Sequence, residues 1–164
     1  MKLRPVFNIR FYHFHSKITI RYKILADLEQ VIQIDEKAFN SNFGFQKIEI
    51  LNNNIGYLKL SEINISGESL KTLYAAMEFV KNTKALIIDL RDNSGGGSTV
   101  GAVFESFFFT RETELLEFKS RNGTSELKKT EPWLLEKKYT KPLHILINGK
   151  TASAAEAITF ALKY

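Results

Sequence analysis

The chain has 164 residues, of which 44% are hydrophobic and 25% are charged, and it contains no cysteine. This composition is typical of one globular domain with a hydrophobic core, and it excludes disulfides and cysteine-based metal sites. No apolar run approaches the roughly 18 residues of a membrane span, and the N-terminus lacks the continuous apolar stretch of a signal peptide. These features do not determine the cellular compartment.

Positive charge is concentrated at the N-terminus. The net charge is +5, and residues 1–25 carry six lysine or arginine residues and no acidic residue. A basic arm of this kind can bind nucleic acid. Between Lys17 and Ile24, however, polar and apolar residues alternate, which is the period of a β-strand with one solvated face. We therefore predict a structural strand and no nucleic-acid partner.

Residues 24–60 contain one predicted helix and two predicted strands. The mixed helical spacing of apolar residues over 24–40 favours a helix. Residues 43–50 and 55–60 are typical of strands, and three asparagines at 52–54 join them. Asparagine tolerates left-handed backbone conformations, so we expect a turn between these strands.

The next segment contains a helix, a buried strand and a glycine loop. Ser66 or Ser69 can cap a helix that has one apolar face over residues 70–80. The run ALIIDL, residues 85–90, suits a strand that is buried on both faces of a parallel sheet. The loop RDNSGGGS follows, and the apolar residues within 103–108 then predict a further helix.

The C-terminal third predicts a hairpin, a strand and a last helix. Residues 114–129 are typical of a hairpin that turns at Asn122–Gly123. The run PLHILIN, residues 142–148, is a second buried-type strand in which His144 is packed. Two strand–loop–helix units indicate an α/β layered domain with crossover connections. The last helix reaches the C-terminus without a glycine stop signal, so we expect the chain to be cut short.

Ser153 lies among small residues at the start of that last helix, in the stretch TASAAE. As a nucleophile it would have the N–H of Ala154 and the positive end of the helix dipole beside it, where an oxyanion forms. As a structural residue, Thr151 or Ser153 would only cap the helix, with Glu156 as the far member of a capping box. The spacing alone favours the cap.

The glycine loop presents a similar choice. Three consecutive glycines at 95–97 follow a buried strand and can present backbone N–H groups to an anion. The loop has neither the lysine of a nucleotide P-loop nor the G-x-G-x-x-G pattern of a dinucleotide site. By itself it indicates only a flexible turn.

Together, the two motifs resemble the core of the tail-specific (C-terminal-processing) serine peptidases. The similarity is greatest to the branch that includes the interphotoreceptor retinoid-binding protein repeats and the tricorn protease core. That superfamily has a strand ending in D-L-R-x-N-x-G-G and a later N-x-x-T-x-S-A-x-E. The matching residues here are Asp89, Leu90, Arg91, Asn93, Gly95 and Gly96, then Asn148, Thr151, Ser153, Ala154 and Glu156. The resemblance extends over roughly residues 40–164.

The resemblance implies a layered β/α core related to the Clp protease and crotonase folds. We expect this core over residues 42–164, incomplete at its C-terminus, after an abbreviated N-terminal segment (strand plus helix) over residues 1–41. The lead-in strands and ALIIDL leave no room between them for a PDZ domain, so recognition of a substrate tail through a PDZ domain is not expected.

The resemblance also assigns roles. Ser153 would be the nucleophile, and Gly95, Gly96 and Ala154 would form the oxyanion hole. Arg91, Asn93 and Glu156 would support these groups by hydrogen bonding. The base is a later lysine in the processing branch, and an N-terminal histidine in the tricorn-like branch. Lys17 aligns best with that histidine, and His15 precedes it by two residues; a strand-surface role for both stays open.

The expected function is hydrolysis of unstructured polypeptides by acyl transfer through Ser153, without a metal or cofactor. No base within the chain is assured, so we expect residues 1–164 alone to be nearly inert as a peptidase. Two alternatives stay open: a non-catalytic carrier of hydrophobic ligands with the same fold, and a crotonase-like acyl-CoA enzyme. The sequence is compatible with a homo-oligomer.

Overall fold

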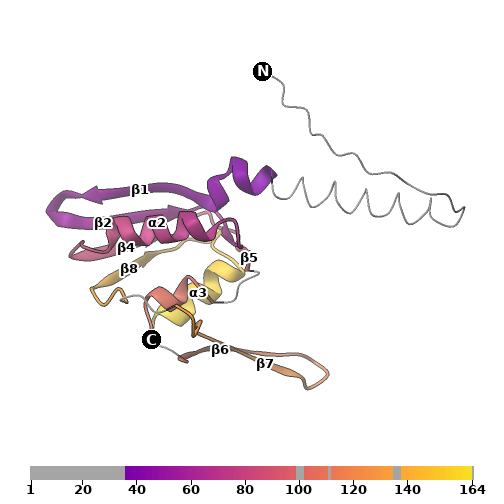
Figure 1. Cartoon of the computed structure of the whole chain (residues 1–164). Coiled ribbons are helices and arrows are strands. Elements are labelled where there is room, and N and C mark those ends of the chain that lie inside the picture. Colours follow the sequence, from indigo (N-terminus) through magenta and orange to yellow (C-terminus); the bar gives the residue numbers. More distant parts are fainter. Residues whose placement is uncertain (1–35, 99–101, 111, 135–137, 164) are drawn as a thin grey trace, which may run out of the picture. The chain divides into compact units, whose positions relative to one another are not determined.

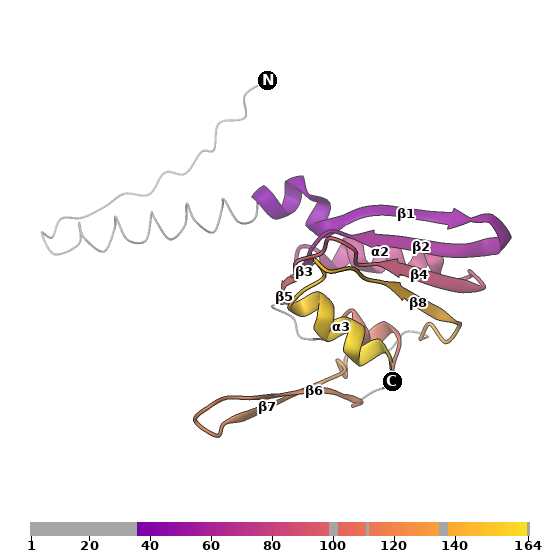
Figure 2. The same cartoon turned by 180° about the vertical axis from the view of Figure 1, so that it is seen from behind.

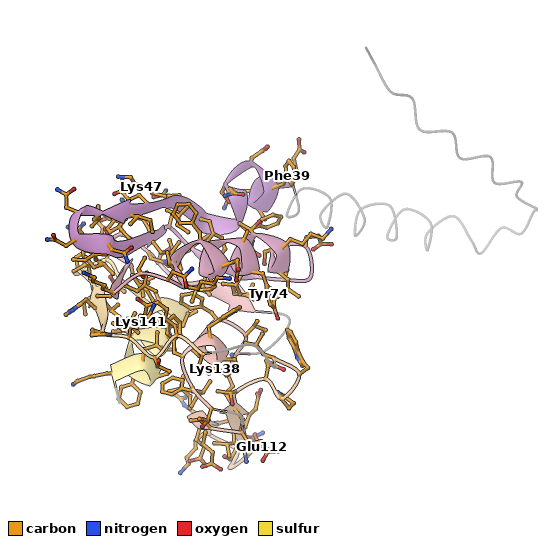
Figure 3. All side chains as sticks on the ribbon, turned by 60° about the vertical axis from the view of Figure 1, so that its left-hand side comes forward. Phe39, Lys47, Tyr74, Glu112, Lys138 and Lys141 are labelled. Carbon is orange, nitrogen blue, oxygen red and sulfur yellow. The ribbon has the colours of Figure 1, made fainter. Side chains whose placement is uncertain are left out.

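The structure is a computed structural model that describes residues 36–98, 102–110, 112–134 and 138–163. Residues 37–164 form one compact unit. The described part begins with helical residues 36–40, where Phe39 projects away from the sheet and is 72% exposed (Figure 3). A 3-10 turn, η1 (Asn42–Gly44), then leads into the first strand.

A four-stranded sheet forms the centre of this unit (Figure 1). Its strands lie in the order β1-β2-β4-β8, with β1 at Phe45–Leu51, β2 at Ile55–Leu60, β4 at Ala85–Asp89 and β8 at Leu143–Leu146. β1 and β2 are antiparallel, whereas β2, β4 and β8 run parallel to one another. Parallel neighbours need crossover connections, so the α/β layered fold expected from the sequence is confirmed.

The β1–β2 hairpin turns through the three asparagines, as predicted. Asn53 and Asn54 have φ angles of 64° and 61°, in the left-handed region that asparagine tolerates better than most residues. A short 3-10 turn, η2 (Asn52–Asn54), forms there. Alternate residues of β2 then face opposite sides of the sheet, which buries Leu58 and Leu60 on one face.

The crossover from β2 to β4 contains a short strand and a helix. β3 (Ile63–Ile65) pairs in parallel with β5 (Gly96–Ser98), and α2 (Leu70–Val80) lies across one face of the sheet (Figures 1 and 2). Ser69 is the N-cap residue of α2, but its side chain makes no capping hydrogen bond to the helix, so the predicted serine cap is wrong. The two serines bond to each other instead. The Ser66 N–H donates to Ser69 Oγ at 2.8 Å, and the Ser69 N–H donates to Ser66 Oγ at 3.4 Å. This reciprocal pair satisfies N–H groups where the turn enters the helix.

One hydrophobic core lies between α2, the sheet and the segments that follow the glycine loop. Large side chains from these elements are fully buried in it: Leu58, Leu60, Leu73, Val80, Leu86, Ile88, Leu90, Val103, Phe104 and Leu134. Burial of each such side chain contributes about 1.5–3 kcal/mol. Packing on this one face therefore holds α2 against the sheet.

The opposite face of the sheet is less covered than the sequence predicts. Ile87 of β4 is partly exposed, and its neighbour on β8, His144, is exposed. The predictions that both strands are buried on both faces and that His144 is packed are therefore wrong. The reason is geometrical, because the buried side chains of α2 and α3 pack with the other face of the sheet.

The segment after the glycine loop is not the predicted α-helix. Residues 102–108 form turns and a single 3-10 turn, η3 (Glu105–Phe107). Its apolar residues are nevertheless buried, and the rings of Phe104 and Phe108 meet edge to face at 5.6 Å. β-branched and aromatic residues lose side-chain freedom in an α-helix, which disfavours a helix here. The apolar spacing therefore indicated that these side chains are buried, but it did not determine the backbone conformation.

A hairpin and a last helix complete the described part. β6 (Glu114–Lys119) and β7 (Ser125–Lys129) form the predicted hairpin, with Gly123 at a φ of 84° in the turn. α3 (Ala154–Lys163) lies between β8 and this hairpin (Figures 1 and 2), and it packs against β5, β6 and η3. The hairpin and η3 therefore stand close to the start of α3.

Several predictions lie outside the described residues. These are the N-terminal strand, Lys17 and His15, and the predicted helix before residue 36. Within the described part of the chain, no helix combines the length and apolar character needed to cross a membrane. The described residues also contain no group of three or more histidine, cysteine or carboxylate side chains that could hold a metal ion.

Candidate active site

Two loops meet at one edge of the sheet. β4 and β8 are parallel neighbours, so the loops that follow them begin side by side at the carboxyl ends of the strands. In open α/β sheets this edge is where ligands bind. The glycine loop follows β4, and residues 147–153 follow β8 and lead into α3. The two sequence motifs are thus brought together in space.

Asn93 connects three segments at this edge. Its buried side chain donates from Nδ2 to the Leu60 carbonyl at 3.0 Å and accepts the Gly95 N–H at Oδ1 at 2.9 Å. Its backbone carbonyl accepts the Ala152 N–H at 3.0 Å. Asn93 therefore links the end of β2, the glycine loop and the residue before Ser153, which supports the positioning role proposed for it.

Thr151 and Asn148 fasten the second loop to the first. Thr151 Oγ1 donates to the Leu90 carbonyl at 2.8 Å and accepts the Asn148 N–H at 3.0 Å. Asn148 Oδ1 in turn accepts the Asp92 N–H at 3.0 Å. Because its hydroxyl is used in these loop contacts, Thr151 does not cap α3.

Asp89 forms a buried ionic network at the end of β4. Arg91 donates to its carboxylate from Nε at 2.9 Å and from a terminal nitrogen at 2.7 Å, and the Tyr57 hydroxyl donates at 2.5 Å. The Arg91 hydrogen bonds hold the pKa of Asp89 well below its usual range. Burial, together with the Asp89 carboxylate, raises the pKa of Tyr57. Through its hydrogen bonds to Asp89, Arg91 thus stabilises the end of β4, where the glycine loop begins.

Ser153 has a strained backbone at the start of α3. Its φ is 54°, in the left-handed region, which costs a residue other than glycine roughly 1–2 kcal/mol. Glu156 accepts the Ser153 N–H at 3.0 Å. Ser153 Oγ is on an exposed residue and has no hydrogen-bond partner among the described residues. Glu156 thus makes the contact expected of the far member of a capping box, whereas the serine hydroxyl makes no capping hydrogen bond among the described residues, so capping does not account for this hydroxyl.

Gly95 lies directly against Ser153. A Cβ atom added to Gly95 would stand 2.7 Å from Ser153 Cβ and 2.8 Å from the Ala152 carbonyl oxygen. The φ of Gly95 is also 101°, which side chains rarely adopt. Only glycine allows the two loops to approach so closely.

The free N–H groups near Ser153 belong to Gly96 and Ala154. The Ile63 N–H donates to the Gly95 carbonyl at 2.8 Å, and Ile63 is the register partner of Gly96, so the Gly96 N–H points away from β3. Ala154 is the first residue of α3, and its N–H has no acceptor among the described residues. The Gly95 N–H is already used by Asn93. Of the three donors expected for the oxyanion hole, Gly96 and Ala154 are therefore the ones whose N–H groups lack an acceptor among the described residues.

Ser153 opens into a cleft of about 360 Å³. Gly96, Gly97 and Ala154 line it beside the serine, and the walls come from β3, η3, α3 and the β6–β7 hairpin. The wall residues are Ile63, Ile65, Glu105, Leu116, Lys128, Ala157 and Ile158. The volume lies within the range of small-ligand sites, so a substrate side chain can enter beside the serine.

No general base is found beside Ser153 among the described residues, since none of them hydrogen-bonds to its hydroxyl. Lys17, the candidate base, lies outside the described part of the chain. The sequence also gave no signal for Glu105 and Lys128, because their place in the cleft depends on how η3 and the hairpin fold over α3. Tyr57 was likewise missed, and only its register opposite β4 could have indicated it.

Comparison with known proteins agrees with this geometry. The model of Peptidase family S41 matches residues 54–164. The chain is 34% identical over 116 residues to carboxy-terminal processing protease CtpA of Bacillus subtilis, a match that covers 70% of this chain and 24% of that protein. It is 33% identical over 111 residues to the chloroplastic carboxyl-terminal-processing peptidase 2 of Arabidopsis thaliana, covering 66% of this chain and 21% of that protein.

Solved structures share the fold. The photosystem II D1 C-terminal processing protease superposes with a TM-score of 0.51 at 26% identity, covering 66% of this chain and 28% of that one. A lipoprotein from Streptococcus agalactiae superposes with a TM-score of 0.52 at 19% identity, covering 78% of this chain and 49% of that one. This chain therefore spans about a quarter of the length of its sequence relatives.

Proposed function

The chain belongs to peptidase family S41, and from this premise we propose that Ser153 is the nucleophile of a serine peptidase. One observation carries the proposal. Ser153 is held at a left-handed φ of 54°, and among the described residues neither its hydroxyl nor the N–H of Ala154 at the helix start has a hydrogen-bond partner. Strain of this kind persists where the surrounding structure imposes it, and it is common at active sites.

In the proposed reaction, Ser153 Oγ attacks the carbonyl carbon of a peptide bond while its proton passes to a general base. The carbonyl oxygen becomes an oxyanion that accepts hydrogen bonds from the Gly96 and Ala154 N–H groups. The tetrahedral intermediate then expels the amine, which takes the proton from the base. Water hydrolyses the acyl-serine ester in a second round of the same chemistry.

The surrounding residues hold this arrangement rather than react. Asn93 fixes the Gly95 N–H, so that the next peptide unit presents the Gly96 N–H toward the cleft. Glu156 takes the Ser153 N–H. Lys17 remains the proposed base, because a lysine can act as a base when burial lowers its pKa.

The proposed substrates are unstructured polypeptides. The supporting observation is that peptidase relatives match across the region that contains both loops. A polypeptide in extended form can bring its backbone close to Gly97, which lines the cleft and has open space where a side chain would stand.

A fluorophosphonate probe tests the nucleophile directly, with the adduct located by mass spectrometry of the intact chain and its peptides. We expect an adduct on Ser153 that forms faster as the pH rises, because solvent hydroxide can then take the proton. The adduct should disappear in Ser153→Ala and persist in Ser94→Ala, a matched control at an exposed serine of the glycine loop. An adduct on another serine, or none even at high pH, would reject the assignment.

A further inference from the structure

Among the described residues that line the cleft beside Ser153, one is a buried acidic residue. Glu105 of η3 is only 8% exposed, yet it lines the same cleft as the serine. Among the described residues, no other side chain donates a hydrogen bond to its carboxylate, and no close ion pair involves it. Burial disfavours the charged form of a carboxylate, so a cation that enters the cleft would stabilise the ionised form of Glu105.

The electrostatics of the cleft involve two titratable side chains. Burial raises the pKa of Glu105, whereas its own backbone N–H and the positive charge of Lys128 act in the opposite direction. Lys128 is half-buried on β7 and is the other ionisable residue that lines the described cleft. Lys128 compensates Glu105 only from a distance, because the two do not form a close ion pair.

The remaining walls are apolar. Ile63 and Ile65 lie on one side, Ala157 and Ile158 of α3 on another, and Leu116 of the hairpin closes the cleft. Lysine and arginine side chains combine an aliphatic stem with a charged end, and they bury the stem along apolar surface. The stem would contact these walls while the charged end reaches Glu105.

We infer that Glu105 is a specificity-determining residue, which selects peptides with a lysine or arginine side chain beside the bond that Ser153 attacks. The inference rests on the proposed function, because Ser153 defines which bond lies at the mouth of the cleft. An acidic side chain is repelled by Glu105. A purely apolar side chain brings no positive charge to the carboxylate, so it binds less well.

Binding of small probes tests this inference without any need for catalysis. The probes are benzamidinium, its neutral isostere benzamide, and benzoate, each titrated into the ¹⁵N-labelled 164-residue chain. Shifts of the Gly96 and Ala157 amide signals report occupation of the cleft. A charge-assisted hydrogen bond contributes about 1.5–3 kcal/mol, so benzamidinium should bind at least about ten-fold more tightly than benzamide.

The matched variants separate this inference from the proposed function. Glu105→Gln should abolish the preference, whereas Glu68→Gln, at an exposed turn, and Ser153→Ala should keep it. If Glu105→Gln does not fold, the preference in the unaltered chain must fade as the pH falls through the pKa of Glu105, while benzamidinium stays charged.

Two results would overturn the inference. One is equal or undetectable binding of benzamidinium and benzamide in the millimolar range. The other is tighter binding of benzoate, which would show that Lys128 governs the cleft. A retained preference together with no fluorophosphonate adduct on Ser153 would show that Glu105 selects the cation and would reject Ser153 as the nucleophile.

Discussion

Because the chain contains no cysteine, Ser153→Cys introduces a single thiol that measures how well this position stabilises an anion. A thiolate develops negative charge beside the free N–H of Ala154 and the positive end of α3, as the oxyanion of an acyl-transfer reaction would. Thiols at helix N-termini have lowered pKa values for this reason. The experiment requires no general base, so it isolates the electrostatics of the site from the question of the base.

The size of the shift follows from three contributions. The helix dipole favours an anion by about 0.3–1 kcal/mol, and one N–H hydrogen bond to a charged group adds about 1.5 kcal/mol at an exposed position. The Glu156 carboxylate, which lies 3.0 Å from the Ser153 nitrogen, opposes the anion by about 1 kcal/mol in a solvated setting. The net effect is roughly 0.8–1.5 kcal/mol, which lowers the thiol pKa by about 0.6–1.1 units from the usual value of about 8.5.

The assay is the pH dependence of alkylation by iodoacetamide, followed by intact mass. We expect an apparent thiol pKa between about 7.4 and 7.9, so that the thiolate fraction at pH 7 rises from about 3% to about 11–28%. Adding Glu156→Gln should lower the thiol pKa further, and Ser94→Cys serves as the control outside a helix start. A Ser153→Cys pKa equal to or above that control would refute the oxyanion-stabilising role of this helix start.

Other expectations concern stability, measured by chemical denaturation. Ser153→Gly should be about 1 kcal/mol more stable than Ser153→Ala, because glycine relieves the left-handed strain; equal stabilities would mean that no strain exists. Asn93→Ala should cost about 2–4 kcal/mol by leaving a buried carbonyl and a buried N–H unpaired, and a loss under 1 kcal/mol would show that its contacts are replaceable. Gly95→Ala should cost about 2 kcal/mol or more through its clash at Ser153, and unchanged stability and Ser153 reactivity would contradict the close packing. The lowered pKa of Asp89 predicts a contribution to stability that is present above about pH 5 and is lost progressively as the pH falls below about 4. The loss of stability in Asp89→Asn, roughly 2 kcal/mol at neutral pH, should therefore shrink in acid. A loss that does not depend on pH would show that the Arg91 hydrogen bonds do not cause it.

The local sequence was sufficient for most of the secondary structure. The asparagine turn, the α2 helix, the strand ALIIDL and the hairpin at Asn122–Gly123 all follow from short-range pattern and turn chemistry. These features depend on backbone preferences of a few neighbouring residues, which the sequence states directly. The same pattern failed at residues 102–108 and at His144. Apolar spacing reports that a side chain is buried, but not which backbone buries it or which face of a sheet a helix covers.

The arrangement of the site was decided only by the tertiary structure. The two motifs predicted that Ser153 and Gly95 lie together, but spacing could not show that Glu156 forms its half of a capping box while the serine hydroxyl does not. Nor could it show that the N–H of Gly95 is taken by Asn93, which leaves Gly96 as the free donor. Each of these facts depends on the direction in which one N–H or carbonyl group points. That direction is set only when two loops that are far apart in the sequence pack together at one edge of the sheet. Sequence patterns encode which residues are polar, whereas only the packed loops determine which polar groups remain unpaired and able to react.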